Sequence, residues 1–363
     1  ASSVRRAARL LGKRRAGMSL STAGVREPET WNPTELSSLR GNSGAPACGG
    51  GSRLATKLSE FSISTLASEG DAEECADELF LSCGTCQIPH PQKVSYGGED
   101  AFFVSSGGSA VGVADGVSEW GARFGLNPRA FACQLMEGAE VAAEAVWMDD
   151  DSLAGRERAA RVMADGYARA TAFGAATALV VALDPAVAAV GVANLGDSGL
   201  RQFRREPGSS SMQIVAQTEE QQHSFGQPFQ LSRVPKPADF PRLLADGKKL
   251  LVEAVRRSKN LKQDLPRDAE LYTFPVQEGD LLLLATDGVF DNIHDAELCG
   301  IIEGLEDPHD VAVAVAEAAF RRSQDPSAST PYSQKVTQAG HKFSGGIPDD
   351  ITVVVARVGS KHP

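Results

Sequence analysis

Acidic residues of this sequence stand directly at the ends of apolar runs. Glu99-Asp100 precedes AFFVS, Asp115-Gly116 follows AVGVA, Asp197 follows AAVGVAN, Asp287 and Asp291 follow DLLLLAT, and Asp349 precedes ITVVVARV. A single Asp-Gly after a strand is usually only a turn. Strand ends of one sheet can, however, converge on one rim. Acids at five strand ends therefore predict a shared site.

Carboxylates brought together repel one another and raise each other's pKa, so they stay ionised easily only around a cation. Oxygen ligands without histidine or cysteine select hard ions, namely Mg²⁺, Mn²⁺ or Ca²⁺. Two such ions can acidify a shared water and hold phosphoryl oxygens. The pattern therefore predicts metal-assisted hydrolysis of a phosphate ester, with in-line attack on phosphorus and no covalent enzyme intermediate.

Other phosphate chemistries leave traces that this sequence lacks. No cysteine is followed six positions later by an arginine, as a cysteine-nucleophile loop would require. The run Asp149-Asp150-Asp151 follows a predicted helix rather than a strand, which argues against an aspartyl-phosphate nucleophile. There is no G-x-x-x-x-G-K-[ST] loop and no H-E-x-x-H helix.

The elements that must position these acids are short apolar strands and a few longer helices. Strands are predicted at 101–105, 110–114, 177–183, 188–194, 280–286 and 351–358, and helices at 131–146, 155–173 and 310–323. The helices fall singly or in pairs between groups of strands. This order favours an α+β fold of stacked sheets with helices outside over a doubly wound parallel sheet.

The chain divides by composition into an N-terminal segment and one large domain. Residues 1–54 begin Arg-rich, Ser-rich and acid-poor and end in a Gly/Ser linker at 41–52, which predicts a disordered targeting segment. A domain is expected over 55–360, with a flap inserted at 234–270. Within the flap, 242–262 is basic; we interpret it either as a solvated surface helix or as a lip that attracts acidic phosphorylated substrates.

Overall composition limits the functions that remain. The 363 residues carry a formal net charge of −11, which argues against nucleic acid as a partner. No apolar run approaches the roughly 18 residues of a membrane-spanning helix, so no transmembrane segment is expected.

Six cysteines are too few for a disulfide scaffold. Cys83 and Cys86 form a C-x-x-C motif. We interpret it either as two incidental cysteines or as a pair whose oxidation controls the activity.

Five ordered motifs resemble those of the type 2C protein phosphatases. They are GGEDA (97–101), VADGVSEW (113–120), NLGDSG (194–199), LLATDGVFDN (283–292) and PDDITVVVARV (348–358). Each is weak alone, but together they are specific. The resemblance implies a four-layer αββα sandwich of two antiparallel sheets flanked by helices, and serine/threonine phosphatase activity on phosphorylated proteins.

The resemblance also implies roles for individual residues. Asp115 would bridge two Mg²⁺ or Mn²⁺ ions with help from the Gly116 carbonyl, and Asp100 would act on the first-ion side. Asp287 and Asp349 would hold the second ion. Asp197 and Asp291 resemble ligands of a weaker third ion, and Glu99 would act through water.

Two family features are missing from this chain. Many relatives have a histidine after the bridging Asp-Gly and an arginine four residues before the Glu-Asp pair, where this chain has Val117 and Ser95. Proton delivery and phosphate capture must then fall to other groups or to solvent. Lys93, Arg123 and His223 are candidates, although a structural role is favoured for His223.

The segments 84–106 and 221–232 resemble the plant and mitochondrial branch of the family, and most of all its chloroplast member acting on photosystem II core proteins. With the basic N-terminus, this predicts the chloroplast stroma, with the mitochondrion as second choice. Two alternatives stay open: a catalytically weak member that binds phosphoproteins as a regulator, and a hydrolase of small phosphate esters. The sequence does not reveal the oligomeric state.

Overall fold

We describe a computed structural model of the chain, covering residues 78–149, 153–258 and 263–361. The predicted targeting segment and linker at 1–54 lie outside the described residues, as does the start of the predicted 55–360 domain.

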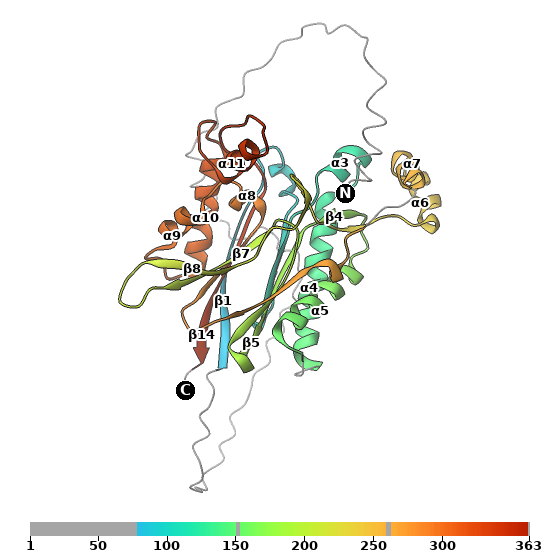
Figure 1. Ribbon diagram of the computed structural model, residues 1–363. Helices are drawn as coiled ribbons and strands as arrows, with labels where there is room; N and C mark the ends of the chain where they lie inside the picture. Colours follow the sequence, from blue (N-terminus) through green and yellow to red (C-terminus); the bar gives the residue numbers. More distant parts are fainter. Residues whose placement is uncertain (1–77, 150–152, 259–262, 362–363) are drawn as a thin grey trace, which may run out of the picture.

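Two antiparallel five-stranded sheets form the centre of the molecule (Figure 1). The first has the order β1 (Glu78–Ile88), β14 (Ile351–Lys361), β13 (Leu281–Ala285), β7 (Gly199–Arg205) and β8 (Met212–Gln217). The second has the order β12 (Glu270–Pro275), β6 (Ala189–Leu195), β5 (Ala178–Asp184), β3 (Ala110–Ala114) and β2 (Ala101–Val104). Two small pairs join β4 (Gly174–Ala176) to β11 (Leu231–Arg233) and β9 (Gln222–Ser224) to β10 (Gln227–Pro228).

The continuous apolar runs are explained by burial on both faces of each sheet. Successive side chains of a strand point to opposite faces. In β13, Leu282 and Leu284 pack between the two sheets, whereas Leu281 and Leu283 pack against the outer helices. All four are almost fully buried. A run of four leucines therefore forms a strand here because both of its faces need apolar side chains.

Helices cover the outer face of each sheet. α4 (Pro128–Asp149) and α5 (Gly155–Arg169) pack on the second sheet; α8 (Asp287–Phe290), α9 (Asp295–Ile302) and α10 (Pro308–Ser323) pack on the first. The start of α10 is fixed locally, since the Asp307 side chain accepts hydrogen bonds from the backbone N–H groups of His309 and Asp310. The four-layer αββα sandwich predicted by the resemblance is confirmed.

The six predicted strands and three predicted helices are present, with ends that differ by a few residues. The predicted helix at 131–146 is α4, which extends further at both ends. Eight strands of the described residues were not predicted: β1, β7, β8 and β12 of the two large sheets, and the short β4, β9, β10 and β11. Short helical turns lie at Val94–Tyr96, Pro185–Val187, Pro237–Asp239 and Pro266–Asp268.

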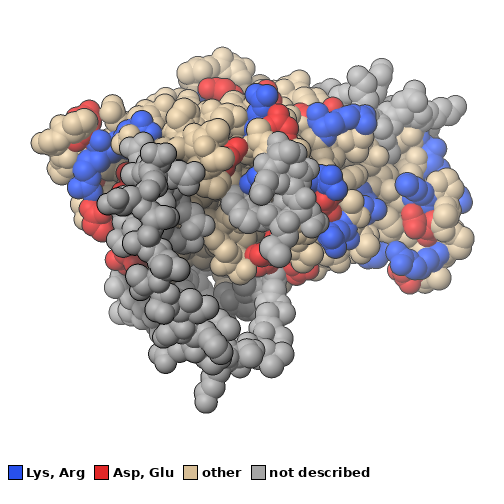
Figure 2. Space-filling model, turned by 90° about the horizontal axis from the view of Figure 1, so that it is seen from below, with Lys and Arg blue, Asp and Glu red and all other residues tan. Residues whose placement is uncertain are grey.

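The basic segment of the predicted flap forms two short helices rather than one. α6 (Phe240–Ala245) and α7 (Lys249–Arg257) are separated by Gly247, whose left-handed φ of 72° breaks the helix. Leu251 and Val252 pack with Phe240 and Leu243 in a small core, against which Trp120 of α3 (Glu119–Phe124) also packs. Figure 2 shows the molecule from below, with basic side chains gathered at the right. This is the side on which α6 and α7 lie in Figure 1. No helix of the described residues has the length and apolar character to span a membrane.

Candidate active site

Strand pairing brings the predicted acids to one end of the sandwich. In the second sheet β2 pairs antiparallel with β3, with Ala101 opposite Ala114, so the start of β2 lies beside the end of β3. Asp100 and Asp115 are therefore neighbours. In the first sheet Ala285 lies opposite Val353, which likewise places Asp287 near Asp349. Because the two sheets stack, both pairs meet, and we call these four residues the central aspartates.

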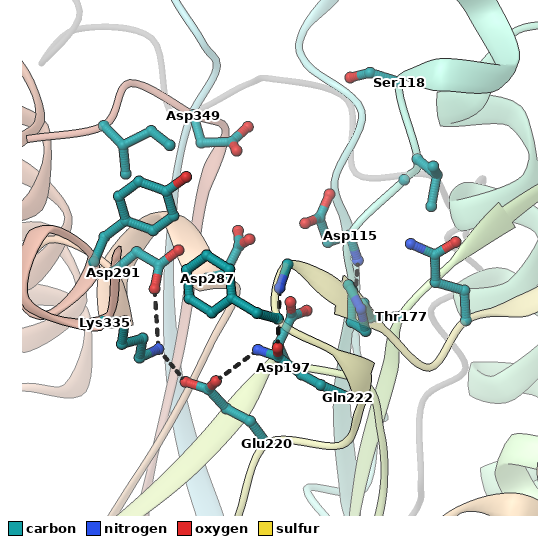
Figure 3. Close-up of a pocket in the computed structure, with 18 residues that line it drawn as sticks. Asp115, Ser118, Thr177, Asp197, Glu220, Gln222, Asp287, Asp291, Lys335 and Asp349 are labelled. Carbon is teal, nitrogen blue, oxygen red and sulfur yellow. Dashed lines mark hydrogen bonds and ion pairs between the residues drawn. The ribbon is translucent and has the colours of Figure 1, made fainter. Parts of the chain in front are cut away.

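A cavity of about 290 Å³ opens at this end (Figure 3). Six of the predicted site residues line it: Asp115, Gly116, Asp197, Asp287, Asp291 and Asp349. Asp197 reaches it from the turn that carries the chain from β6 in one sheet to β7 in the other. Asp100 and Glu99 are buried and do not line the cavity. Thr177, Glu220, Tyr332 and Lys335 also line it and were missed from the sequence.

The central aspartates are buried close together and their negative charges repel one another. Burial, followed by the charges of Asp100 and Asp287, raises the pKa of Asp115 well above its ordinary value. Burial and then Asp349 do the same to the pKa of Asp287. Burial raises the pKa of Asp100 to about 7, with Asp350 as its main charged neighbour. Asp115 thus interacts with acids from both sheets.

Two of the oxygens of the central aspartates also lack hydrogen-bond partners. Within the described ranges, Asp100 Oδ1 and Asp287 Oδ1 are buried without any partner. No basic side chain of these ranges donates a hydrogen bond to the central aspartates, and the Lys93 ammonium nitrogen stays 4.0 Å from Asp349 Oδ1. Buried polar atoms are normally satisfied, so these oxygens fit a cation that binds between them.

The donor set restricts the kind of cation. It consists of carboxylate oxygens, with the Gly116 backbone beside them, which suits Mg²⁺ or Mn²⁺. In the part of the chain that the structure describes, no three His, Cys, Asp or Glu side chains enclose one ion by themselves. Mg²⁺ usually keeps several waters in its shell, so this open arrangement still fits such an ion.

The loop before β2 has its shape fixed by two contacts. Arg129 of α4 donates hydrogen bonds to the backbone oxygens of Gly97 at 2.6 Å, Gly98 at 3.2 Å and Asp100 at 3.3 Å. Gly98 has a left-handed φ of 78°, and a Cβ there would lie 2.5 Å from Asp350 Oδ1. The second glycine of GGEDA, Gly98, is therefore needed to let Asp350 approach.

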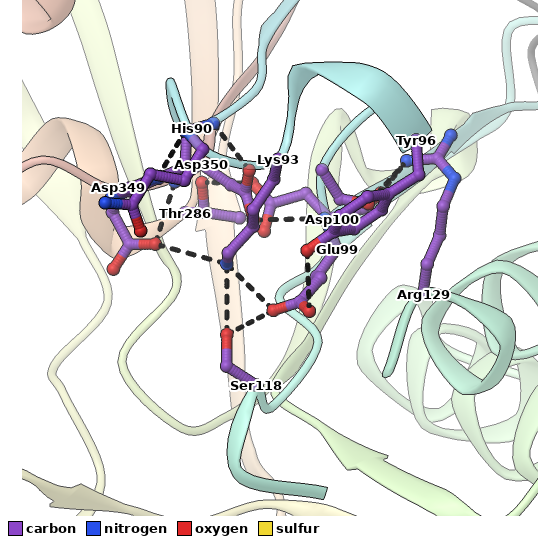
Figure 4. A network of polar contacts seen from close by, with 12 residues as sticks. His90, Lys93, Tyr96, Glu99, Asp100, Ser118, Arg129, Thr286, Asp349 and Asp350 are labelled. Atoms are coloured by element: carbon purple, nitrogen blue, oxygen red, sulfur yellow. Dashed lines mark hydrogen bonds and ion pairs between the residues drawn. The ribbon is translucent and has the colours of Figure 1, made fainter. Parts of the chain in front are cut away.

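Acids beside the centre are neutralised by a lysine (Figure 4). The Lys93 ammonium donates to Glu99 Oε2 at 2.8 Å, Asp350 Oδ2 at 2.8 Å and Ser118 Oγ at 3.0 Å. We call Lys93, Glu99 and Asp350 the Lys93 flank. An ammonium group has three donors, and these contacts use all three. Lys93 therefore holds the acids in place and has no donor left to capture phosphate.

A second lysine lies on the opposite side of the cavity. Lys335 of α11 (Pro331–Gln338) donates to Asp291 Oδ1 at 3.2 Å and to Glu220. We call Lys335, Glu220 and Asp291 the Lys335 flank. No sequence pattern links these three positions, which lie on separate segments, so the sequence gives no signal for the contact.

The other two candidates for the missing family residues lie away from the cavity lining. Arg123 pairs with Glu119 on the surface of α3, at 3.6 Å. His223 bonds to Asp264 at 3.0 Å and stacks on the Phe229 ring, which is the structural role that was favoured for it.

No family model matches the chain. It is 32% identical over 292 residues to the probable protein phosphatase 2C 55 of Arabidopsis thaliana, covering 79% of this chain and 54% of that protein. It is 32% identical over 293 residues to the probable protein phosphatase 2C 26 of the same plant, covering 77% of this chain and 85% of the relative. The human protein phosphatase PTC7 homolog is 31% identical to this chain over 274 residues, covering 72% of this chain and 79% of that protein.

The chain spans little more than half the length of the first two relatives, protein phosphatases 2C 55 and 2C 80 of Arabidopsis thaliana. Among solved structures, the X-ray structure of the photosystem II phosphatase PBCP matches with a TM-score of 0.60 and 30% identity, covering 76% of this chain and 98% of that one. The shared fold, the ordered acidic motifs and these relatives together show that the chain belongs to the protein phosphatase 2C family.

Proposed function

We propose that this chain is a metal-dependent protein serine/threonine phosphatase whose central aspartates hold two Mg²⁺ or Mn²⁺ ions. The observation that carries the proposal is the convergence of the central aspartates: three of them line one cavity with Asp100 buried beside them, two have buried oxygens without a partner, and their pKa values are raised. When bound, the ions would supply an acidified water and positive charge toward the phosphoryl oxygens.

The chain's own residues give this site its shape. Asp115 is held by Thr177: the Asp115 N–H donates to Thr177 Oγ1 at 3.1 Å, and the Thr177 N–H donates to the Asp115 carbonyl at 3.0 Å. Its carboxylate faces acids of both sheets, so it is the proposed bridge between the two ions. Asp100 and the Gly116 carbonyl would act with it on one ion, and Asp287 and Asp349 on the other. Glu99 would act only through water, since Lys93 and Ser118 already bind it.

The cavity and the relatives support the proposed substrate class. The cavity is lined mainly by charged and polar groups, which suits a phosphorylated side chain better than an apolar ligand. The basic helices α6 and α7 lie at the surface, where they would attract acidic segments around a phosphorylated residue. The likeness to a photosystem II phosphatase supports phosphoproteins of the photosystem II core as candidate substrates, and the chloroplast stroma as the location. The PTC7 homologue keeps the mitochondrion as second choice.

The test is hydrolysis of a phosphothreonine peptide with Mn²⁺, with EDTA, and by Asp287→Asn. The control variant is Asp310→Asn, at an exposed position of α10. We expect activity only with Mn²⁺, its loss in Asp287→Asn and its retention in the control. Turnover that survives EDTA or Asp287→Asn would contradict the proposal. Metal binding without turnover on any phosphopeptide would indicate a phosphoprotein-binding regulator. A strong preference for p-nitrophenyl phosphate would indicate a small-ester hydrolase.

A further inference from the structure

The acids at this end of the sandwich fall into three groups that differ in charge balance. The Lys93 flank and the Lys335 flank each contain two acids and one lysine in direct contact. The central aspartates receive no hydrogen bond from a basic side chain in the described ranges. Each flank therefore has a lysine that balances part of its negative charge. The central aspartates have no such partner, so they are the acids whose charge divalent ions would balance.

Lys335 is held firmly at the edge of the cavity. The Thr330 hydroxyl accepts from the Ser333 N–H and donates to the Gly345 carbonyl, which fixes the start of α11. The Tyr332 N–H donates to the Asp291 carbonyl at 3.0 Å and ties the first turn of α11 to Asp291 itself. The Lys335 side chain is only 34% exposed, and that of Asp291 only 17%. Figure 3 shows the ammonium group between Asp291 and Glu220.

This arrangement conflicts with the third ion that the family resemblance implied. That ion would need the carboxylates of Asp197 and Asp291. One of them is already bound to Lys335, whose positive charge also acts on Asp197. An ammonium group and a divalent ion repel strongly at such short range. A third ion could bind there only after Lys335 had moved away from two acidic partners.

We propose that the Lys335 ammonium takes the place of a third divalent cation, so that this chain binds ions only at its central aspartates. Asp291 then acts as a lysine partner rather than as a metal ligand. The inference builds on the proposed two-ion function, but it concerns a difference between variants and can fail separately from it.

The experiment counts Mn²⁺ ions per chain by calorimetric titration and by electron paramagnetic resonance, up to millimolar Mn²⁺. We expect two ions in the wild type and in Lys335→Arg, which keeps the charge. Lys335→Gln and Lys335→Met should each bind one more. The third ion should be bound roughly tenfold or more tightly in these variants than in the wild type. Adding Asp291→Asn to Lys335→Gln should abolish the extra ion, and circular dichroism checks that each variant folds.

The inference is overturned if the wild type binds a third ion as tightly as Lys335→Gln, or if neither uncharged variant gains one. A wild type that binds no ion at the central aspartates would refute the proposed function instead. The gain of one ion on losing the lysine charge would still decide the role of Lys335 in that case. Persistence of the extra ion in the Asp291→Asn double variant would also contradict the inference, because that ion would not lie at the Lys335 flank.

Discussion

The ammonium nitrogen of Lys93 lies 2.8 Å from Asp350 Oδ2, and this contact joins the two sheets at the candidate active site. Lys93 belongs to the loop that leads into β2 of the second sheet, whereas Asp350 directly precedes β14 of the first. Asp350 also accepts hydrogen bonds from the N–H groups of His90 at 2.7 Å and Glu99 at 3.0 Å. The position of Asp349, the next residue back along the chain, therefore depends on this contact.

Lys93→Met should destabilise the protein and weaken the site. It leaves the buried carboxylates of Glu99 and Asp350 without their cation, and breaking such a pair costs about 3 kcal/mol. Urea unfolding measures the loss of stability, and Mn²⁺ titration measures the expected loss of affinity. Lys93→Arg should retain most of the stability and most of the Mn²⁺ affinity. Lys342→Met, at an exposed position, is the control. An unchanged unfolding midpoint in Lys93→Met would contradict the structural role.

Asp115→Asn should stabilise the metal-free protein while removing its response to metal. Burial and neighbouring acids raise the pKa of Asp115, so its ionised form is unfavourable in the absence of a cation. The neutral amide of nearly the same shape removes that repulsion. With EDTA, the urea midpoint should therefore rise above that of the wild type. With Mn²⁺, the wild type should gain stability by mass action, and the variant much less.

Asp310→Asn is the matched control for this comparison: any small change from the charge lost in the first turn of α10 should be the same with EDTA and with Mn²⁺. A metal-free Asp115→Asn protein that is less stable than the metal-free wild type would show that the central aspartates are not strained, and would contradict the electrostatic reasoning.

The central aspartates could be predicted from the sequence because each lies at the end of an apolar run that both sheets bury. The strand ends, and the antiparallel pairing, then bring them together. The lysine flanks could not be predicted, since Lys93 and Asp350 are 257 residues apart and no local pattern connects them. Likewise β8 and β12 were missed because they lie at sheet edges, where one face is solvated and the apolar signal is weak.

Charge reversal on α7 should affect protein substrates selectively. Lys249 and Arg257 are exposed, whereas Arg256 lies over the Phe240 ring at 5.1 Å and supports the small core. Lys249→Glu with Arg257→Glu should raise KM for an acidic phosphoprotein roughly tenfold at low salt, with little change for p-nitrophenyl phosphate. High salt should reduce the difference. Arg321→Glu, on the outer helix α10, is the control. An equal change for both substrates would exclude substrate attraction by this helix.

Cys83 and Cys86 should not form a disulfide with each other. Both lie on β1, three residues apart, so their side chains point to opposite faces of the sheet. Cys83 packs between the sheets, and Cys86 packs on the side of the outer helices. Their Cα atoms are roughly 10 Å apart along a strand, beyond the reach of about 7 Å for a disulfide. The geometry thus opposes redox control through this pair.

The thiols should also react slowly near neutral pH. Burial raises the pKa of both Cys83 and Cys86 to about 11, and the thiolate is the reactive form. At pH 8 their alkylation by iodoacetamide, followed by peptide mass spectrometry, should be roughly two orders of magnitude slower than that of a free cysteine. The rate should rise about tenfold per pH unit until the pKa is reached.

The raised pKa values of Cys83 and Cys86 also predict how the stability of the protein changes with pH. The buried thiols stay neutral while the unfolded thiols ionise, so their contribution to stability is complete below the unfolded pKa and is lost as pH rises from there toward 11. Cys83→Ala with Cys86→Ala should flatten this alkaline decline in urea midpoint. Phosphatase activity should be the same after oxidation and after dithiol reduction. Rapid alkylation of Cys83 at pH 8, or recovery of a peptide linked from Cys83 to Cys86, would refute this account of β1.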